Sequence, residues 1–572
     1  MRRPTSTSGL VDAAGRALPS SRRGSATLER PQAGAKRHGV FMSGWRPGLR
    51  SADADWLYDR NDVIARSRDV GRNEGVGASA STRMLNSAVG FRWTLSCTPN
   101  WRLLGVSYEA ARELGAQIEA LWETYAYGVH FTSDAERIST FGGQLRMAAA
   151  HIFNDGEALG LVEYAADEAT TFRTRLRLVD PDRLSNPNGR PDTPTLAGGV
   201  EKTATLIPIA YHIREGHPYD LHGVASLNWR RWPRYIDSGY GWDRPHVLHA
   251  FDRLRAGQTR GVTRFASVLK LFRAFSKYTE ATLEAAALNA LFLGFVKSNA
   301  GPSSVNEAFA PEDLQNFNAQ REEFYGDEAT LTVDGVQMPV LGLDDEVQMQ
   351  TTARDTSGYD GFTRSILRLI AAALGVTYEE LSMDFSSTNY SSARAALLIA
   401  WREVLALRGI LEQQLAWPFF SAWLEEAFDL GLVRPPAGAP AFHDAVDAYV
   451  EGRWRGPGRG HVDPTKEVVA AAARIEAGIT TLEDEVAEYD GGDWQERLEQ
   501  QARIEAKRRE LGLPTTPGAS EAAAGQNSPE ADRERDARPN SRTGGRGAGA
   551  LGRAAEIAFD PAHDAALDAR AR

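Results

Sequence analysis

The chain has 572 residues, 42% of them hydrophobic and 25% charged, which is an ordinary globular composition with room for roughly two to four domains. Cys97 is the only cysteine, which excludes an intramolecular disulfide framework and cysteine-rich metal sites, and a reducing cytoplasm is the expected place of synthesis. The net charge is −11, but residues 1–50 carry +8 and residues 514–572 carry −1, which leaves −18 for the middle of the chain. A body this acidic is poorly suited to tight, salt-sensitive binding of phosphates, although it could surround DNA without gripping it.

The two ends of the chain differ from its middle. Residues 1–45 are rich in Arg, Ser, Gly and Pro, so we expect a disordered basic N-terminal arm. The arm has no hydrophobic segment of the secretory type, and its likeness to an organelle transit peptide is superficial because it lacks an amphipathic face. Residues 514–572 are expected to form a disordered tail. The longest mostly apolar run, residues 285–296, contains Asn289 and is too short for a bilayer, so we expect no membrane partner.

The first half of the chain alternates helical and strand patterns, which predicts an α+β domain over residues 46–264. Apolar residues at spacings of three and four predict helices at 55–89, 108–127 and 138–153, with Ile118, Leu121, Trp122 and Tyr125 of the second facing inward. Alternating patterns predict strands at 91–95, 157–164, 171–179, 204–214 and 245–251.

The second half begins with a long helix, predicted over residues 265–298. Residues 299–350 are irregular and include a predicted β hairpin, 330–333 and 337–341, around the turn Asp334-Gly335. A further helical unit is predicted over residues 461–513.

Residues 362–428 contain two helices joined by a polar loop. The first, 362–373, should bury one face, and Gly375 ends it; that face comprises Phe362, Ile366, Leu367, Leu369, Ile370 and Ala373. Residues 382–392 are crowded with Ser, Thr and Asn and predict a loop. The second helix should begin with Ser391 or Ser392 as its N-cap, kink at Trp417-Pro418 and end near Phe428. Its predicted apolar stripe comprises Leu398, Trp401, Leu405, Leu411 and Leu415.

No established catalytic motif is present, so we expect neither an enzyme nor a bound cofactor. The chain lacks a GxxxxGK[ST] phosphate loop, a GxSxG nucleophile elbow and an HExxH zinc helix. Five histidines recur at short intervals, but a five-residue spacing suits neither one strand face nor one helix face; they are His212, His217, His222, His246 and His249. Ordinary histidines are therefore favoured over a metal site. The run 344–346 is acidic, and a solvated turn is favoured there over a divalent ion.

Two clusters combine arginine with strand or aromatic positions. One is Arg173, Arg175 and Arg177 on one strand face; the other is Arg230, Arg231 and Arg234 with Trp229 and Trp232. Both resemble nucleic-acid patches, but Arg and Trp also anchor protein interfaces. In an acidic chain we favour subunit contacts.

Several ordered motifs carry a family resemblance, covering roughly residues 40–513. The stretches 368–376, 378–382 and 389–394, together with Asp384, resemble the signature of lambda-like tailed-phage portal proteins. The same family shows similar motifs elsewhere in the chain: Ile64 to Asp69 with Arg72-Asn73, Gly156-Glu157, Leu178 to Leu184, and Arg260-Gly261-Val262. Thr263-Arg264 departs from the Pro or Ser and aromatic residue expected after Arg-Gly-Val.

The resemblance implies a portal fold, α+β with long helices, that forms a ring oligomer. It implies a basic arm (1–45), an α+β wing (46–264), a stem helix (265–298), a clip with a β hairpin (299–350), wing and tunnel helices with a tunnel loop (351–439), a helical crown (440–513) and a tail (514–572).

The resemblance also implies a function: about twelve copies form a ring at one capsid vertex, through which double-stranded DNA is packaged and later ejected. The implied partners are terminase, the major capsid protein and head-completion or connector proteins. The loop then lines the DNA channel, where weak hydrogen bonds exchange easily with water; its candidate residues are Asp384, Ser386, Ser387, Thr388, Asn389, Tyr390, Ser391 and Arg394. Candidate interface residues between copies are Trp401, Leu405, Trp229, Arg230 and Arg231.

Two other classes of function remain open from the residues alone. A cytoplasmic hydrolase without a recognised motif would be active as a monomer. A non-viral DNA-binding adaptor would hold duplex DNA with a steep salt dependence, which the acidic body argues against.

Overall fold

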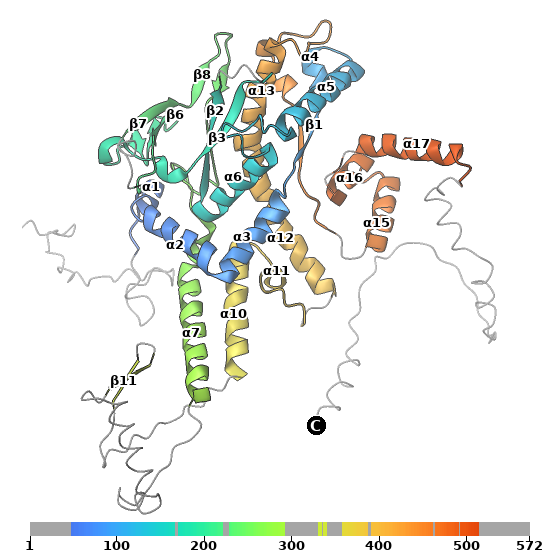
Figure 1. The fold of residues 1–572 in the computed structure, drawn as a ribbon. Helices are drawn as coiled ribbons and strands as arrows, with labels where there is room; N and C mark the ends of the chain where they lie inside the picture. The colour runs from blue at the N-terminus through green and yellow to red at the C-terminus, as the bar shows by residue number, and fades with distance from the viewer. Residues whose placement is uncertain are drawn as a thin grey trace, which may run out of the picture. The chain divides into compact units, whose positions relative to one another are not determined.

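The computed structural model describes residues 47–165, 170–220, 228–291, 330–333, 336–339, 357–386, 390–460, 464–490, 492 and 494–513. The predicted N-terminal arm, the C-terminal tail, the turn Asp334-Gly335 and the acidic run 344–346 lie outside these residues. The chain divides into two compact units, residues 1–494 and 495–572. Among the described helices, none combines the length and the apolar character that a bilayer crossing requires. Element labels follow Figure 1.

Three helices replace the single helical region predicted at 55–89. They are α1 (Ala52–Trp56), α2 (Arg60–Asn73) and α3 (Gly75–Ala88). Glu74 is extended (ψ 113°) and separates α2 from α3. A Cβ on Gly77 would lie 2.6 Å from Val70 Cγ1, so α3 packs closely against the end of α2. Hydrophobic periodicity continues across this break and therefore does not reveal it.

A three-stranded antiparallel sheet forms the centre of the α+β region, with the order β10-β2-β3. Its strands are β2 (Glu157–Tyr164), β3 (Thr174–Val179) and β10 (Val247–Phe251), close to three of the predicted strands. β2 directly follows helix α6 (Phe141–Asp155), which ends at Gly156 in the left-handed region (φ 94°). Only glycine adopts this conformation without strain, which fixes the sharp turn from helix to strand.

Further antiparallel sheets complete the β structure of the described residues. One has four strands in the order β4-β5-β6-β7, and the remaining strands form the pairs β8-β9, β1-β13 and β11-β12. The strands are β1 (Thr94–Cys97), β4 (Leu196–Ala197), β5 (Val200–Lys202), β6 (Pro208–Arg214), β7 (Trp229–Pro233), β8 (Tyr235–Asp237), β9 (Asp243–Pro245), β11 (Thr330–Val333), β12 (Val336–Pro339) and β13 (Gly452–Arg455). The predicted strand 91–95 is thus observed three residues later, as β1, paired with a strand far along the chain.

The main core is an aromatic cluster around Trp122, which is 1% exposed. Trp122 lies on α5 (Tyr108–Tyr127), whose observed bounds match the predicted helix. Its ring centroid is 5.1 Å from that of Phe141 on α6 and 5.0 Å from that of Trp423 on α13 (Trp417–Asp429). Ile118 and Tyr125 are also buried, as expected.

A π-helical turn, Glu412–Ala416, joins α12 (Tyr390–Leu411) to α13, just before the predicted kink at Trp417-Pro418. Pro418 has no N–H to donate to a carbonyl one turn back, and the Trp417 N–H bonds to the Glu412 carbonyl five residues earlier. The turn places the side chain of Gln414 at the outer edge of strand β10. Its side-chain amide accepts a hydrogen bond from the Phe251 N–H at 3.1 Å and donates one to the Phe251 carbonyl at 3.2 Å.

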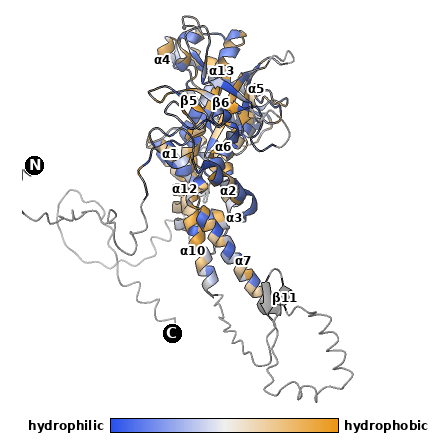
Figure 2. Ribbon diagram, turned by 90° about the vertical axis from the view of Figure 1, so that its left-hand side faces the viewer, coloured by the Kyte–Doolittle hydropathy of each residue, from blue (hydrophilic) through white to orange (hydrophobic). Residues whose placement is uncertain are grey.

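Two helices, α7 (Leu269–Leu291) and α10 (Ser357–Leu374), lie side by side (Figure 1). Tyr278 on α7 contacts Tyr359 and Phe362 on α10, with ring centroids 5.6 and 4.4 Å apart. The predicted buried face of α10 is partly wrong. Its buried residues are Ile366, Leu367, Ile370, Ala371 and Leu374, whereas Phe362 is 43% and Leu369 58% exposed, and Ala373 is exposed as well. Figure 2 shows hydrophobic residues over much of this helix, which explains why periodicity chose the face incorrectly.

Gly375 ends α10 as predicted, with φ 76° and a hydrogen bond from the Val376 N–H to the Ala371 carbonyl. The short helix α11 (Tyr378–Ser382) follows, and Thr377 and Glu380 form a capping box at its start. α12 begins at Tyr390, so Ser391 and Ser392 lie inside the helix, and the prediction that one of them is the N-cap is wrong.

The C-terminal helical unit consists of separate short helices. In the first compact unit these are α15 (Pro464–Glu476) and α16 (Leu482–Asp490). Two further short helices lie outside the predicted stretch 461–513: α14 (Val446–Tyr449) just before it and α4 (Trp101–Leu104) earlier in the chain. α17 (Trp494–Glu510) belongs almost entirely to the second unit.

Candidate functional site: the loop before α12 and the buried ion cluster

The structure places the candidate channel residues on both sides of a gap. Asp384 and Ser386 lie in the loop after α11, and Ser387, Thr388 and Asn389 lie outside the described residues. Tyr390, Ser391 and Arg394 belong to the first turns of α12. Arg394 forms an ion pair with Glu467 on α15 at 3.7 Å. The candidate channel residues that the structure describes are therefore close together in the sequence, but they do not form a cluster of catalytic groups.

Asp384 orders the first part of the loop. Its Oδ1 accepts hydrogen bonds from the Ser386 N–H at 3.0 Å and the Ser386 hydroxyl at 2.6 Å, and the Tyr378 hydroxyl donates to Oδ2 at 3.2 Å. The hydrogen bonds from Ser386 lower the pKa of Asp384, so it stays charged at neutral pH. The loop is also less polar than its composition suggests, because Met383 is 57% and Phe385 56% exposed.

The candidate interface residues have different surroundings. Trp401 is half-buried against the core with the guanidinium of Arg408 over its ring, whereas Leu405 is 49% exposed. Three more lie on β7, where Trp229 donates a hydrogen bond to the Ser185 hydroxyl, Arg230 lies over Trp232, and Arg231 pairs with Glu201 at 2.8 Å. Trp401 and the β7 residues thus have contacts within their own subunit.

Glu157 is the centre of a buried ion cluster that sequence reasoning missed. Its carboxylate is fully buried and accepts hydrogen bonds from Arg60 at 2.8 Å, Arg260 at 2.7 Å, His249 at 2.9 Å and the Gly261 N–H at 2.8 Å. Burial alone would raise the pKa of Glu157, but the charges of Arg260 and Arg60 outweigh it and hold that pKa well below its usual value. Glu157 is therefore a carboxylate at every ordinary pH.

Arg260, one of the two arginines of this cluster, connects segments that lie far apart in the sequence. Arg260 donates its remaining hydrogen bonds to the carbonyls of Pro181, Leu184 and Gly198. Beside it, a Cβ on Gly261 would lie 2.0 Å from the Gly156 carbonyl oxygen, so only glycine permits this approach. Glu157, Arg260 and the 181–184 turn belong to three motifs of the family resemblance, which thus meet at one point. Their physical role here is to hold the fold, because Glu157 and Arg260 bind each other and backbone groups of distant segments.

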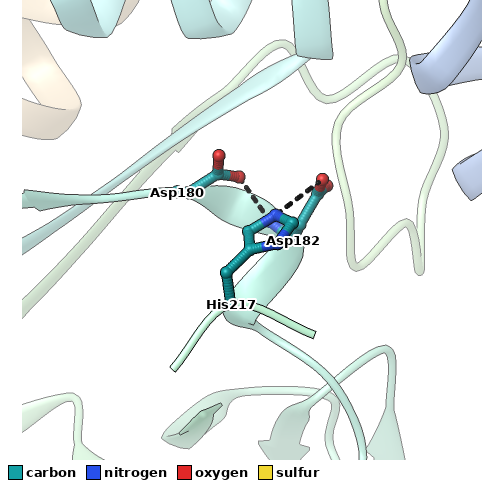
Figure 3. Close-up of side chains that lie close together, drawn as sticks. All are labelled: Asp180, Asp182 and His217. Atoms are coloured by element: carbon teal, nitrogen blue, oxygen red, sulfur yellow. Dashed lines mark hydrogen bonds and ion pairs between the residues drawn. The ribbon is translucent and has the colours of Figure 1, made fainter. Parts of the chain in front are cut away.

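A second set of charges lies beside this cluster. Arg68 on α2 donates to Asp155 at 2.8 Å, Asp182 at 2.7 Å and Asp180 at 3.1 Å. Asp180 and Asp182 also approach His217 (Figure 3), and these three are spaced closely enough to hold a metal ion. The guanidinium of Arg68 already supplies positive charge to the two carboxylates, which favours an ion-pair network as the explanation of this spacing.

The same explanation applies to the second group with metal-like spacing, Glu425, Asp429 and His443. Glu425 is 1% exposed and is paired with Arg244, and the Trp242 indole donates to it at 3.1 Å. Each of these two groups contains a single histidine, so within the described residues neither group brings two histidines together.

The first arginine cluster is only partly exposed, because Arg173 is exposed while Arg175 is buried. Arg175 is 7% exposed, and Arg177 forms an ion pair with Glu163 at 2.9 Å. The backbone N–H groups of Arg173 and Thr174 donate to Glu426 of α13 at 2.7 and 2.9 Å. This strand therefore contributes to packing within the subunit, and the expected role of its arginines in contacts between subunits stays a prediction.

Comparison with known proteins agrees with the motifs. The family model described as "Phage portal protein, lambda family" matches residues 38–408. The chain is 33% identical to the portal protein of Escherichia phage N15, covering 83% of this chain and 89% of that protein. It is 32% identical to portal protein B of Escherichia phage lambda, covering 84% of this chain and 90% of that protein.

Similarity to solved structures is weaker. A chain from the neck of a native GTA particle, computed with C12 symmetry, has a TM-score of 0.37 and 13% identity, covering 80% of this chain and all of that one. The family assignment depends on the sequence matches, which extend over most of the chain: it belongs to the lambda family of phage portal proteins.

Proposed function

We propose that the chain is the portal subunit of a tailed phage or prophage and assembles into a ring of about twelve copies at one capsid vertex. The observation that carries the proposal is the similarity to the lambda and N15 portal proteins over more than four fifths of the chain. The portal role is structural, and the place of the assembled protein is the virion. Terminase, the major capsid protein and head-completion proteins are its proposed partners.

Double-stranded DNA passes through the centre of this ring during packaging and ejection. The loop 382–392 lines the channel in this proposal, because its Ser, Thr and Asn side chains offer weak hydrogen bonds that water can replace. The charge of −18 on the middle of the chain supports passage rather than tight binding, since phosphates are repelled by carboxylates.

The proposed parts follow the boundaries expected from the sequence, with one change. Residues 46–264 form the wing, 299–350 the clip and 440–513 the crown. The stem comprises the helix 265–298 together with the beginning of α10, because Tyr278 of α7 packs against Tyr359 and Phe362 of α10. Two paired helices resist bending better than one.

Native mass spectrometry with negative-stain imaging tests the proposal. We expect rings with a central hole and a mass near twelve subunits. A stable monomer or dimer at micromolar concentration across several salt conditions would contradict it and favour a monomeric enzyme.

The role of the loop is tested by charge. Replacing Ser386 and Ser387 with lysine should leave ring mass unchanged but slow DNA entry, because ammonium groups bind the passing phosphates. The measurement is the DNA packaged per minute in a reaction with the cognate terminase, and the matched control replaces the same residues with alanine. Equal packaging rates for the two variants would contradict the proposal that the loop lines the DNA channel.

A further inference from the structure

Both α10 and α12 have a second apolar face that the subunit itself leaves uncovered. On α10 the exposed face comprises Ser365, Leu369, Ala372 and Ala373, which we call the α10 face; Phe362, one turn earlier, already packs against Tyr278 of α7. Their spacing of three and four places them together on one side of the helix, beside the buried stripe of Ile366, Leu367 and Ile370. Over about two turns the face itself has no charged side chain, and the exposed Arg368 at its border turns its guanidinium over the ring of Tyr378.

On α12 the corresponding surface comprises Ala395, Leu398, Ile399, Arg402, Leu405 and Ala406, which we call the α12 face. Leu398 is 43%, Ile399 66% and Leu405 49% exposed. The opposite side of the helix packs into the core through Val404, Leu407 and Leu411. Arg402 is the only charged residue on the α12 face.

The two faces differ in shape. Apart from Leu369, the α10 face is shallow, because Ser365, Ala372 and Ala373 let another helix approach closely on either side of that leucine. The α12 face projects Leu398, Ile399 and Leu405, which suit the shallow surface as knobs suit holes. Each face therefore fits the other better than it fits a copy of itself.

Charge favours the same pairing. If two α12 faces met across a two-fold axis, each Arg402 would approach the other in an apolar contact, and like charges out of water are destabilising. Against the uncharged α10 face, one Arg402 at the middle of the contact meets no like charge and can extend its guanidinium to the rim.

From this we propose that the α12 face of one copy packs on the α10 face of the next copy around the ring. The inference rests on the proposed portal ring and specifies its contact: it is heterologous, using two different surfaces, which is the kind of contact that closes a ring of more than two subunits. The occupant of each face is a second copy of this chain.

Two variants and their mixture test the pairing. Leu369→Asp damages only the α10 face, and Ile399→Asp damages only the α12 face; both positions are exposed, so the subunit should remain folded, as circular dichroism can verify. We expect each variant alone to be monomeric by native mass spectrometry. A one-to-one mixture should give a heterodimer and nothing larger, because Leu369→Asp retains a sound α12 face and Ile399→Asp a sound α10 face.

The matched control is Val129→Asp, a change of the same kind at a residue that is 83% exposed and lies on neither face; it should form rings as wild type does. If either aspartate variant unfolds, the pair Leu369→Ser and Ile399→Ser replaces it with the same expectation. A mixture that stays monomeric, or single variants that still form rings, would overturn the pairing while leaving the portal function intact. A wild-type chain that forms no ring would instead contradict the proposed function.

Discussion

Arg260 donates its Nε–H to Glu157 at 2.7 Å, joining two residues that are 103 positions apart, in a site where both side chains are at most 2% exposed. Taking a carboxylate and a guanidinium out of water costs several kcal/mol each, and only mutual attraction and further hydrogen bonds offset that cost. Here Arg60, His249 and the Gly261 N–H complete the set. The stability of the α+β region therefore depends on the balance of charge within this cluster.

The first prediction concerns that balance. Glu157→Gln removes the negative charge and leaves Arg60 and Arg260 buried near each other, so we expect the free energy of unfolding to fall by about 3–5 kcal/mol. Urea denaturation of the purified chain measures it. As a control, Glu123→Gln breaks an exposed pair with Arg92 and should cost less than about 1 kcal/mol.

The second prediction concerns pH. Burial lowers the pKa of His249 below its usual value, an effect the bond to Glu157 only partly offsets, so His249 is neutral and donates its Nε2–H. As pH falls through about 6.5, His249 becomes protonated in the unfolded chain but stays neutral in the folded chain. The free energy of unfolding should therefore decrease as the pH is lowered. Glu157 adds a further loss only below about pH 4.5, where its unfolded form begins to be protonated. Urea midpoints at pH 7.5 and 5.5 measure the difference.

His249→Gln provides the comparison for this pH effect, because an amide can still donate to Glu157 but does not titrate. The drop in urea midpoint between the two pH values should be smaller in this variant than in the wild type. An equal drop would assign the acid sensitivity to other groups.

A third prediction concerns two glycines. Gly261→Ala would place a Cβ 2.0 Å from the Gly156 carbonyl oxygen, so the Glu157 segment must move and the free energy of unfolding should fall by several kcal/mol. Gly71→Ala meets nothing within 4 Å inside α2 and should raise stability by about 0.5–1 kcal/mol. Thermal melts of the two variants should therefore shift in opposite directions.

The fourth prediction concerns the sheet edge. Gln414→Ala leaves the Phe251 N–H and carbonyl without their partners, which should cost about 1–3 kcal/mol. Gln414→Glu retains an acceptor but loses the donor, so it should also destabilise the chain. Gln413→Ala, at an exposed position in the same π turn, is the matched control and should have little effect.

Local patterns predicted much of the fold. The helix at 108–127 and the strand at 157–164 were predicted with their observed bounds, because an amphipathic period and strict alternation are local signals. The buried face of α10 was predicted only in part, since a helix that is apolar on two sides does not reveal which side its own subunit covers. The break at Glu74 depends on the packing of Gly77 against Val70, which no local pattern contains.

The site was less accessible to sequence reasoning. Glu157 begins a mostly apolar strand, and an acidic residue followed by a buried run is a signal that it needs a buried partner. Its partners Arg60 and Arg260 lie 97 and 103 positions away, and only the tertiary structure identifies them. The channel role of residues 384–394 stays a prediction, because part of that loop lies outside the described residues.

The glutamine at the π turn has a consequence for assembly. β10 is the end strand of its sheet, and an end strand with free N–H and carbonyl groups adheres to any other strand that it meets. When many copies gather at one place, as portal subunits do in this proposal, that adhesion competes with the correct contact. Gln414 occupies the polar groups of Phe251 and closes this part of the edge. The π-helical turn that packs against the sheet thus also limits incorrect strand pairing between neighbouring copies, and with it aggregation.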